Sequence, residues 1–371
     1  MSPSEQALFA QILEELDAFA LESAQGTSDT VLLRQFHLRW RAKFGSQGEM
    51  LALRVFTIRH ARDEGAPMIA IITALPKEFA AVECLLDAVE DIAIPGCGAG
   101  RRYTRANLSA TSGGSHKVVL ALMADMGNNI AAIRAALLLE HFPTVEAIIM
   151  TGIAGGIPHP AKLEDHVRLG DIVVSNRNGV VQYDNLKSGR KGKIVVDTVR
   201  AAPRPPAAKL LEAVRYLEAR ALRGVEPWHE HIDRACQSLN IARPSAETDV
   251  LHHSTNRQEV ITHPDDTRRK PGRPLIFQGP IAAANILLKD PVRRDRLRDA
   301  HGVKAVEMEG SGIADATWHA DNGYLVVRGI CDYCDMSKDD AWQAYAAAIA
   351  AAYTIALIAS MPATEMKHNG H

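Results

Sequence analysis

Residues 68–78 read MIAIITALPKE, an unbroken apolar run that ends in a proline and two charged residues. Such a run is typical of a strand that is buried on both faces of a parallel sheet. Similar runs return further along the chain, at 118–123, 147–150, 172–175, 275–277 and 324–327. Helical patterns separate them, over 79–86, 129–141, 290–300, 309–319 and 344–361. This alternation predicts an α/β fold with a central, mainly parallel, twisted sheet.

Helical periodicity also fills residues 4–62, and this part of the chain ends at a boundary sequence, EGAP, at 64–67. We expect residues 1–65 to form a helical N-terminal segment, either an interaction or regulatory module or an extension packed on the main body. Residues 66–363 are expected to form the main domain, followed by a tail over 364–371.

The alternation of strands and helices stops between about 186 and 273. Basic loop sequence at 187–191 leads to several prolines, one amphipathic helix is expected around 210–217, and polar sequence runs from 252 to 273. A long irregular segment within a compact domain is typical of a functional loop region. We therefore interpret 186–273 as an insertion at the functional edge of the sheet.

The composition is that of a soluble globular protein, with 47% hydrophobic residues and a formal net charge of −2. That charge indicates neither nucleic acid nor an anionic membrane as the main partner. The N-terminal sequence lacks the basic and apolar parts of a signal peptide, so a cytoplasmic location is expected. The alanine-rich run at 344–361 is interrupted by Tyr353 and Thr354, which favours a buried helix over a transmembrane span.

The chain has five cysteines, an odd number that favours reduced thiols in an intracellular setting. Cys331 and Cys334 form a C-x-x-C pair, but no second pair and no nearby His cluster completes the ligand set of a zinc site. No metal site is therefore predicted.

Unusual residues follow the predicted strands at their carboxyl ends, where open parallel sheets place functional groups. The glycine-rich segment TGIAGGI at 151–157 lets a ligand approach the backbone closely. It has neither the Gly-Lys-Ser/Thr of a P-loop nor the dinucleotide-binding spacing. Glu78, Glu309 and Asp332 place three carboxylates at the same set of strand ends. Charges beside buried strands are costly unless they are paired or functional, so these carboxylates are candidates for chemistry.

Five motifs resemble the purine nucleoside phosphorylase and nucleosidase superfamily, in particular methylthioadenosine/S-adenosylhomocysteine nucleosidases. They are IAIITALPKE (69–78), TGIAGGI (151–157), GDIVVS (170–175), VEME (306–309) and VRGICD (327–332). The resemblance covers about 68–361 outside the insertion. It implies a nucleoside phosphorylase-like three-layer fold around the central sheet, no metal or organic cofactor, and a homodimer or larger homo-oligomer.

Further motifs resemble a branch of that superfamily that is fused to signalling and immune-type domains in fungi and bacteria. They are GVVQYD (179–184), CDYCD (331–335) and AWQAYA (341–346). The branch includes nucleosidases that destroy nucleotides such as ATP during phage defence. An antiphage or stress effector is therefore implied, with N-terminal helices that bind a partner or self-associate.

The resemblance implies catalytic roles for two carboxylates. Asp332 matches the general acid that protonates N7 of the purine, which makes the base a better leaving group. Glu78 matches the carboxylate that activates the attacking water. Phosphorylases bind phosphate near this first loop with glycine and arginine, and 73–78 contains neither, so hydrolysis is favoured over phosphorolysis.

The resemblance also implies binding residues for the two halves of a nucleoside. Glu309 matches the carboxylate that binds the ribose hydroxyls and stabilises an oxocarbenium-like transition state. The ribose set is Glu309, Met308, Met126 and Gly127, and the base set is Ala154, Gly155, Ala282 and Glu307. Ala282 stands where many nucleosidases place a stacking Phe, and Asp125 adds a negative charge in the loop expected beside the ribose.

Basic residues in or beside the insertion are candidates for binding a 5′-phosphate or triphosphate, or else belong to a solvated loop. They include Arg177, Lys187, Arg268 and Arg269, together with Arg190, Lys191, Lys193 and Lys270. Arg328, four residues before Asp332, is expected either to orient that carboxylate or to form a structural ion pair.

The leading hypothesis is a hydrolase that cleaves the N-glycosidic bond of an adenine nucleoside or nucleotide such as ATP or AMP. Three alternatives remain: a phosphate-dependent purine nucleoside phosphorylase, a methylthioadenosine/S-adenosylhomocysteine nucleosidase, and a sensor that binds purine nucleotides without cleaving them. Asp332, Glu309 and Glu78 together favour an enzyme, because a pure binder needs no acid opposite a water-activating base.

Overall fold

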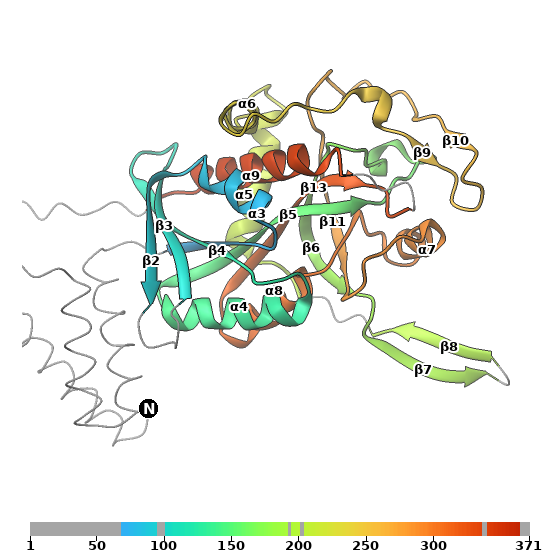
Figure 1. Ribbon diagram of the computed structural model, residues 1–371, viewed down its shortest axis with the longest axis horizontal. Coiled ribbons are helices and arrows are strands. Elements are labelled where there is room, and N and C mark those ends of the chain that lie inside the picture. The colour runs from blue at the N-terminus through green and yellow to red at the C-terminus, as the bar shows by residue number, and fades with distance from the viewer. Residues whose placement is uncertain (1–67, 95–100, 192–193, 201–203, 336–339, 364–371) are drawn as a thin grey trace, which may run out of the picture.

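The computed structural model describes residues 68–94, 101–191, 194–200, 204–335 and 340–363. The N-terminal segment predicted to be helical and the predicted tail lie outside these residues, as does Cys97. Within the described chain, a central sheet carries helices on both faces (Figure 1). The predicted α/β class and its three layers are confirmed.

A nine-stranded sheet forms the centre of the molecule, in the order β12-β11-β6-β13-β5-β1-β4-β3-β2. Its strands are β1 (Met68–Thr73), β2 (Asp87–Ile94), β3 (Arg101–Ser109), β4 (Ser115–Leu122), β5 (Val145–Gly156), β6 (Ile172–Gln182), β11 (Ile276–Ala283), β12 (Ala305–Glu307) and β13 (Gly323–Asp332). The strands at the centre, from β4 through β1 and β5 to β13, run parallel. Their side chains are buried on both faces, which is why their sequences are continuously apolar.

The sheet is antiparallel at places that the sequence did not indicate. Strands β2 and β3 add an antiparallel hairpin beside β4, and their charged residues conceal the strand pattern. Strand β6 runs antiparallel to β13. Short β12 pairs in parallel with β11 and antiparallel with β5, so the strands from β12 to β5 form a closed ring. This ring brings the carboxyl end of β5 beside residues 305 and 306.

Helices cover the two faces of the sheet. On one side α9 (Gln343–Ser360) packs with α3 (Pro76–Glu83), α5 (Ala208–Ala221) and α6 (Trp228–Ser238). On the other side α4 (Asn128–His141) packs on α8 (Gly310–His319), as the lower part of Figure 1 shows. Helix α7 (Pro291–His301) lies beyond β11.

Helix α9 is the one helix among the described residues that is long and apolar enough to cross a membrane, and 83% of it is buried inside the domain. It packs on β5 and β13. The approach is so close that a Cβ at Gly329 in β13 would collide with the carbonyl oxygen of Ala346. The predicted buried closing helix is therefore confirmed.

The predicted insertion contains more regular structure than its sequence indicates. Its amphipathic helix is α5, and α6 follows it. Strands β7 (Leu186–Lys191) and β8 (Ile194–Val199) form a hairpin that projects from the body, and β9 (Leu251–His252) pairs with β10 (Val260–Ile261). The insertion thus divides into a projecting hairpin and a part packed on the domain.

Candidate active site

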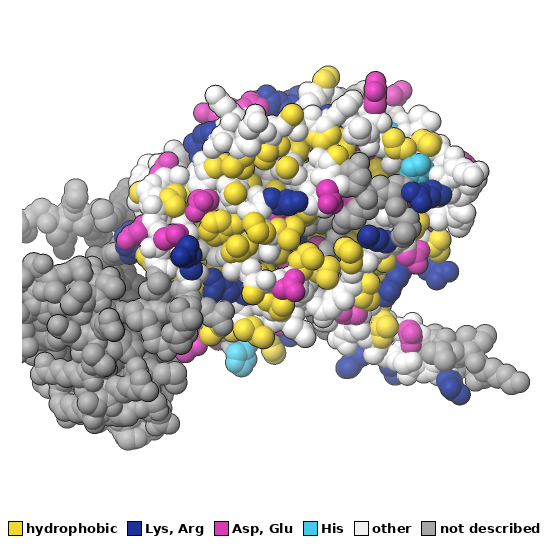
Figure 2. All heavy atoms as spheres, viewed as in Figure 1, with side chains coloured by type: hydrophobic (Ala, Val, Ile, Leu, Met, Phe, Trp, Pro, Cys, Tyr) yellow, Lys and Arg dark blue, Asp and Glu magenta, His cyan; other side chains and the backbone are white. Residues whose placement is uncertain are grey.

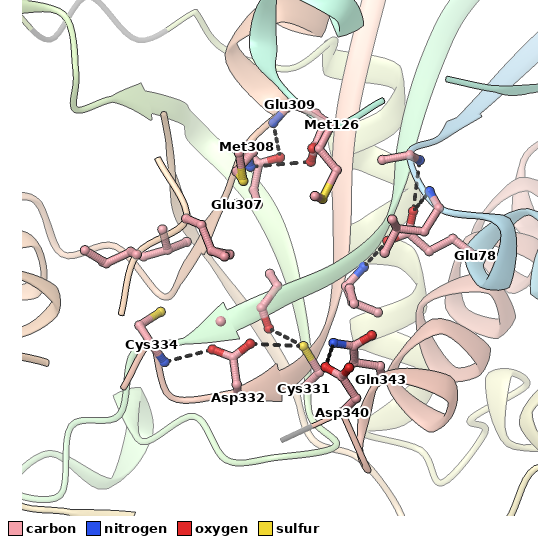
Figure 3. A pocket seen from close by; sticks show the side chains of 18 of the residues that line it. Glu78, Met126, Glu307, Met308, Glu309, Cys331, Asp332, Cys334, Asp340 and Gln343 are labelled. Atoms are coloured by element: carbon pink, nitrogen blue, oxygen red, sulfur yellow. Dashed lines mark hydrogen bonds between the residues drawn. The ribbon is translucent and has the colours of Figure 1, made fainter. Parts of the chain in front are cut away.

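A cavity of about 570 Å³ lies at the carboxyl ends of the central strands. It is lined by the turn after β1, the end of β5, the segment after β11, the turn after β12 and the end of β13. Glu78, Glu309 and Asp332 approach it from three directions (Figure 3). The structure thus brings together three carboxylates that lie far apart in the sequence, as expected for strand ends.

Glu78 is the third residue of α3, and its carboxylate folds back over the turn that joins β1 to the helix. Oε2 accepts hydrogen bonds from the backbone N–H groups of Ala74 at 2.9 Å and Leu75 at 2.8 Å. Oε1 accepts one from the N–H of Ile153 at 2.8 Å. Burial raises the pKa of Glu78, although the charge of Arg328 and the backbone hydrogen bonds partly oppose this.

Arg328 lies at the centre of a fully buried group that we call the Arg328 cluster: Arg328, Glu307, Glu309 and Glu78. The guanidinium donates from Nη2 to Glu307 and, at 3.0 Å, to Glu309. Glu78 belongs to the cluster because its charge, like those of Glu307 and Glu309, raises the pKa of Arg328. One guanidinium therefore faces three carboxylates, and burial raises the pKa of Glu307 despite the guanidinium.

Arg328 pairs with these glutamates and not with Asp332. Of the two roles expected from the sequence, the ion pair is the one present in the structure. The strand explains why: four extended residues separate the two positions by about 13 Å, and a bulge between Ile330 and Asp332 interrupts the alternation of side chains.

The candidate ribose residues lie together at one side of the cavity. Glu309 Oε1 accepts the backbone N–H of Gly127 at 3.3 Å, so the loop before α4 is joined to the turn after β12. Met308 and Met126 line the cavity on either side of this contact, and Met126 is 41% exposed. Gly127 takes part through its backbone, at φ 121°, and Asp125 is exposed and does not line the cavity.

Asp332 ends β13 and faces the cavity between two cysteines. Its Oδ1 accepts the backbone N–H of Cys334 at 2.8 Å, and Cys331 Sγ lies 3.3 Å from Oδ2. Both cysteine side chains are buried and line the cavity (Figure 3). The C-x-x-C pair therefore surrounds the candidate acid, a position that the spacing alone did not indicate.

The candidate base residues are divided by the structure. Ala154 and Gly155 line the cavity, and a Cβ at Gly155 would collide with Cys334 Sγ and lie 2.9 Å from Asp332 Oδ1. Glu307 also lines it, but its carboxylate is used by Arg328 and by the N–H groups of residues 309 and 310. Ala282 is fully buried in a separate apolar cluster and does not line the cavity.

The four basic residues proposed to hold phosphate lie away from the cavity. Arg177 and Lys187 are exposed on β6 and β7, and neither lines it. Arg268 pairs with Asp266, and Arg269 with buried Asp171. None of the four therefore lies in the cavity wall, and ion pairs with Asp266 and Asp171 occupy the two arginines.

Two lysines line the cavity instead. Lys77, one residue before Glu78, donates from Nζ to Gln343 Oε1 at 2.5 Å, and Lys289 follows the segment after β11. Both are exposed at the mouth of the cavity. Lys77 lies within a motif that the sequence singled out, and its position at the start of a helix beside a candidate base was the available signal. Nothing in the sequence pointed to Lys289.

No group of three or more His, Cys, Asp or Glu side chains among the described residues is arranged to hold a metal ion.

Comparisons with known proteins agree on the fold of this chain. A sequence model described as the phosphorylase superfamily matches residues 68–359. The solved S-adenosylhomocysteine nucleosidase of Streptococcus pyogenes, in complex with 5-methylthiotubericidin, superimposes with a TM-score of 0.53 at 18% identity over 80% of this chain and 98% of that one.

Three relatives illustrate the range of similar proteins. A nucleotide-binding leucine-rich repeat-like protein of Hyaloscypha variabilis is 31% identical over 77% of this chain. The ATP nucleosidase Cap17 of Escherichia coli is 27% identical over 78%, and a 5′-methylthioadenosine/S-adenosylhomocysteine nucleosidase of Mycobacterium bovis is 26% identical over 80%. The chain spans 28% of the first relative, 50% of the second and 98% of the third.

Proposed function

The chain belongs to the phosphorylase superfamily. We propose that it is a hydrolase that cleaves the N-glycosidic bond between a purine and ribose, with adenine as the purine. One observation carries this proposal. Glu78, Glu309 and Asp332, from three separate strand ends, line a single cavity together with the backbone of residues 153–155. The names of the bacterial relatives support a nucleosidase.

In this mechanism Asp332 is the general acid, which gives a proton to N7 of the base as the bond from N9 to C1′ breaks. Its Oδ1 accepts the N–H of Cys334, and we assign the proton to Oδ2, which lies 3.3 Å from Cys331 Sγ. The base then leaves as a neutral purine. General acid catalysis of this kind contributes about 10²–10⁴-fold to a rate.

The Arg328 cluster supplies the electrostatics. Breaking the bond leaves positive charge on the ribose, and Glu309, which shares the guanidinium of Arg328 with Glu307, is the cluster's carboxylate beside the sugar. A carboxylate in a buried site stabilises a cation more strongly than it would in water. Glu309 also accepts hydrogen bonds from the ribose hydroxyls.

Glu78 acts as the base for the attacking water. Its Oε1 accepts a single backbone hydrogen bond, so one lone pair remains for a water proton. Its raised pKa makes it a stronger base than an exposed glutamate. Water oxygen bonds to C1′ while its proton passes to Glu78, and the products are the free base and the ribose moiety.

The two lysines at the mouth favour a substrate with a 5′-phosphate chain. Lys77 and Lys289 are the lysines that line the cavity within the described chain, at its exposed end. The similarity to an ATP nucleosidase supports a nucleotide substrate. A methylthioadenosine nucleosidase is the second candidate, because Ile286, Leu287 and Leu288 line the same cavity and suit an apolar 5′ group.

The decisive experiment is base release from ATP, AMP, adenosine and methylthioadenosine in phosphate-free buffer, followed by chromatography. We expect adenine and a ribose product without added phosphate, and a loss of at least about 100-fold in Asp332→Asn. A rate that depends on phosphate would establish a phosphorylase. Tight binding of these ligands without any release would establish a sensor.

Lysine variants test the substrate class. We expect Lys77→Met and Lys289→Met each to lower kcat/KM for ATP by about tenfold, the value of one charge-assisted hydrogen bond, and to leave adenosine within about twofold. Lys209→Met is the matched control, because Lys209 pairs with Glu146 away from the cavity. Equal effects on ATP and adenosine would exclude a phosphate-binding role.

We also propose that subunits pair on the face that carries the cavity. Figure 2 shows apolar side chains gathered over the middle of the face in view. Exposed apolar residues include Leu287 at 54% and Met126 at 41%, both in the cavity wall, and Ile133 at 61% on α4.

Light scattering should give at least twice the mass of 40.3 kDa, and Ile133→Asp should lower the measured mass. A monomer at micromolar concentration would contradict this.

A further inference from the structure

A second buried polar group lies outside the cavity, where the insertion meets the segment that carries Asp332. We call it the Asp249 cluster: Asp249, Tyr333, Arg168, His263 and His166. Asp249 and His263 belong to the insertion, Arg168 and His166 to the segment between β5 and β6, and Tyr333 follows Asp332. The cluster therefore joins three parts of the chain, one of which carries the candidate acid.

Asp249 is the centre of this cluster. The hydroxyl of Tyr333 donates to its Oδ1 at 2.5 Å, and Arg168 donates from Nε to its Oδ2 at 2.7 Å. His263 Nε2 lies 3.4 Å from Oδ1. Burial alone would raise the pKa of Asp249, but the hydrogen bond and charge of His263, the hydroxyl of Tyr333 and the charge of Arg168 lower it to about 2. Asp249 is thus an anion that accepts hydrogen bonds from Tyr333 and from Arg168.

Tyr333 is held at both ends. Its hydroxyl also accepts the backbone N–H of Leu169 at 3.2 Å, and its carbonyl oxygen accepts Nη1 of buried Arg294 on α7 at 2.8 Å. The ring is 3% exposed. A residue fixed by its side chain and by its backbone leaves the adjacent peptide groups little freedom.

This fixed residue determines where the carboxylate of Asp332 lies. Asp332 Oδ1 is bound to the N–H of Cys334, on the far side of Tyr333, so backbone and carboxylate move together. Gly155 faces Asp332 so closely that a Cβ there would lie 2.9 Å from Oδ1. A small shift of residues 332–334 would therefore move the acid relative to the base-binding wall, and displacements of about 1 Å can cost about 100-fold in rate.

We propose that Tyr333 and Asp249 are positioning residues for the acid Asp332, so that the insertion is part of the catalytic apparatus and more than a surface addition. This inference rests on the proposed function, since it assigns the proton donor to Asp332. Neither Tyr333 nor Asp249 lines the cavity. They act on the reaction through the peptide segment 332–334.

The test compares Tyr333→Phe with Tyr324→Phe. Each change removes one hydroxyl from a buried tyrosine on or next to β13; that of Tyr324 donates to the carbonyl of Arg204 at the opposite end of the strand. We expect Tyr333→Phe to lower kcat at least about tenfold and to leave KM within about twofold. The substrate still binds, but proton transfer from the displaced acid is slower. Tyr324→Phe should leave both constants within about twofold.

A double-variant cycle separates positioning from a general loss of structure. If Tyr333 acts through Asp332, then Tyr333→Phe should change the residual rate of Asp332→Asn by less than about twofold, measured as release of radiolabelled base over hours. A merely structural role would lower that residual rate by the same factor as in the wild type. Asp249→Asn, which keeps an acceptor oxygen but loses the charge, should fall between wild type and Tyr333→Phe.

The outcomes distinguish this inference from the proposed function. A wild-type protein that releases no base from any of the four substrates contradicts the proposed function. An active wild type with Tyr333→Phe within twofold in kcat, or with equal losses in Tyr333→Phe and Tyr324→Phe, overturns the inference alone. Melting temperatures of the two variants are measured beside the kinetics, and a Tyr333→Phe protein that is unfolded at the assay temperature is replaced by Asp249→Asn in the same cycle.

Discussion

The Arg328 cluster and the Asp249 cluster each take one residue from the same short segment of chain, 328–333, but they differ in charge balance. In the first, one guanidinium faces three carboxylates. In the second, one carboxylate is paired with Arg168 and also accepts the hydroxyl of Tyr333. Unbalanced buried charge is costly and is kept where chemistry uses it, whereas a balanced group holds its neighbours in place. The first cluster therefore serves the reaction and the second serves its geometry.

The largest effect is expected from breaking the Arg328 cluster. Arg328→Met leaves buried carboxylates without their cation, which should cost about 3–5 kcal/mol in the free energy of unfolding. For a domain of this size that corresponds to a fall in Tm of about 6 °C or more, together with loss of activity. Differential scanning calorimetry measures it.

Arg273→Met is the control for that variant, since Arg273 makes an ion pair at the surface with exposed Asp233. It should change stability by less than about 1 kcal/mol. Similar losses in the two arginine variants would show that the cluster is not special.

Glu78→Gln should separate chemistry from stability within the first cluster. We expect kcat to fall about 100-fold, because an amide cannot take a proton from water, with a smaller loss of stability than in Arg328→Met. In the wild type, kcat/KM should fall as the pH drops through the pKa of Glu78, since only the ionised form acts as a base. That pKa is raised by burial, so the fall should begin at a higher pH than for an exposed glutamate. A pH profile with the same acid limb in Glu78→Gln would contradict this role.

Gly155→Ala tests the contact that lies between the two clusters. The new Cβ meets Cys334 Sγ and Asp332 Oδ1, so it should displace the acid and lower kcat by about tenfold while the protein remains folded. Adding Cys334→Ala removes one of the two clashes and should restore part of the activity. Wild-type activity in Gly155→Ala would show that the acid tolerates displacement and would weaken both the mechanism and the positioning role.

The smallest effect is expected from His166, at the edge of the Asp249 cluster. Burial, together with the charges of His263, Arg269 and Arg168, lowers its pKa to about 3 despite the opposing charge of Asp249. The unfolded chain, with a pKa near 6.5, therefore binds more protons between pH 6.5 and 3, and stability should fall as the pH drops through this range. Asp249, whose pKa folding lowers to about 2, adds its own loss of stability only below about pH 4.

His166→Asn isolates that contribution. Its melting temperature should decline less steeply than that of the wild type between pH 6.5 and 4.5, by a few degrees over the interval. Parallel curves for the two proteins would show that His166 is not kept neutral by folding.

The central strands and the candidate catalytic carboxylates were predictable from the sequence. Strands β1, β4 and β5 have apolar runs because both of their faces are buried, and this pattern is local. The motifs around Glu78, Glu309 and Asp332 also lie within short segments. By contrast, the hairpin of β2 and β3 was missed because its stability comes from pairing with β4 and its sequence is rich in charge.

Local sequence patterns were therefore enough to predict the α/β class, the buried closing helix, the family resemblance and the strand ends that carry Glu78, Glu309 and Asp332. The pairing of the charges became visible only in the folded chain. The fold joined Arg328 to two glutamates, engaged Arg269 with Asp171, removed Ala282 from the cavity, and brought Asp249 to Tyr333. The physical reason is range: strand and helix patterns depend on neighbouring residues, whereas an ion pair depends on which distant segments the folded chain brings within a few ångströms.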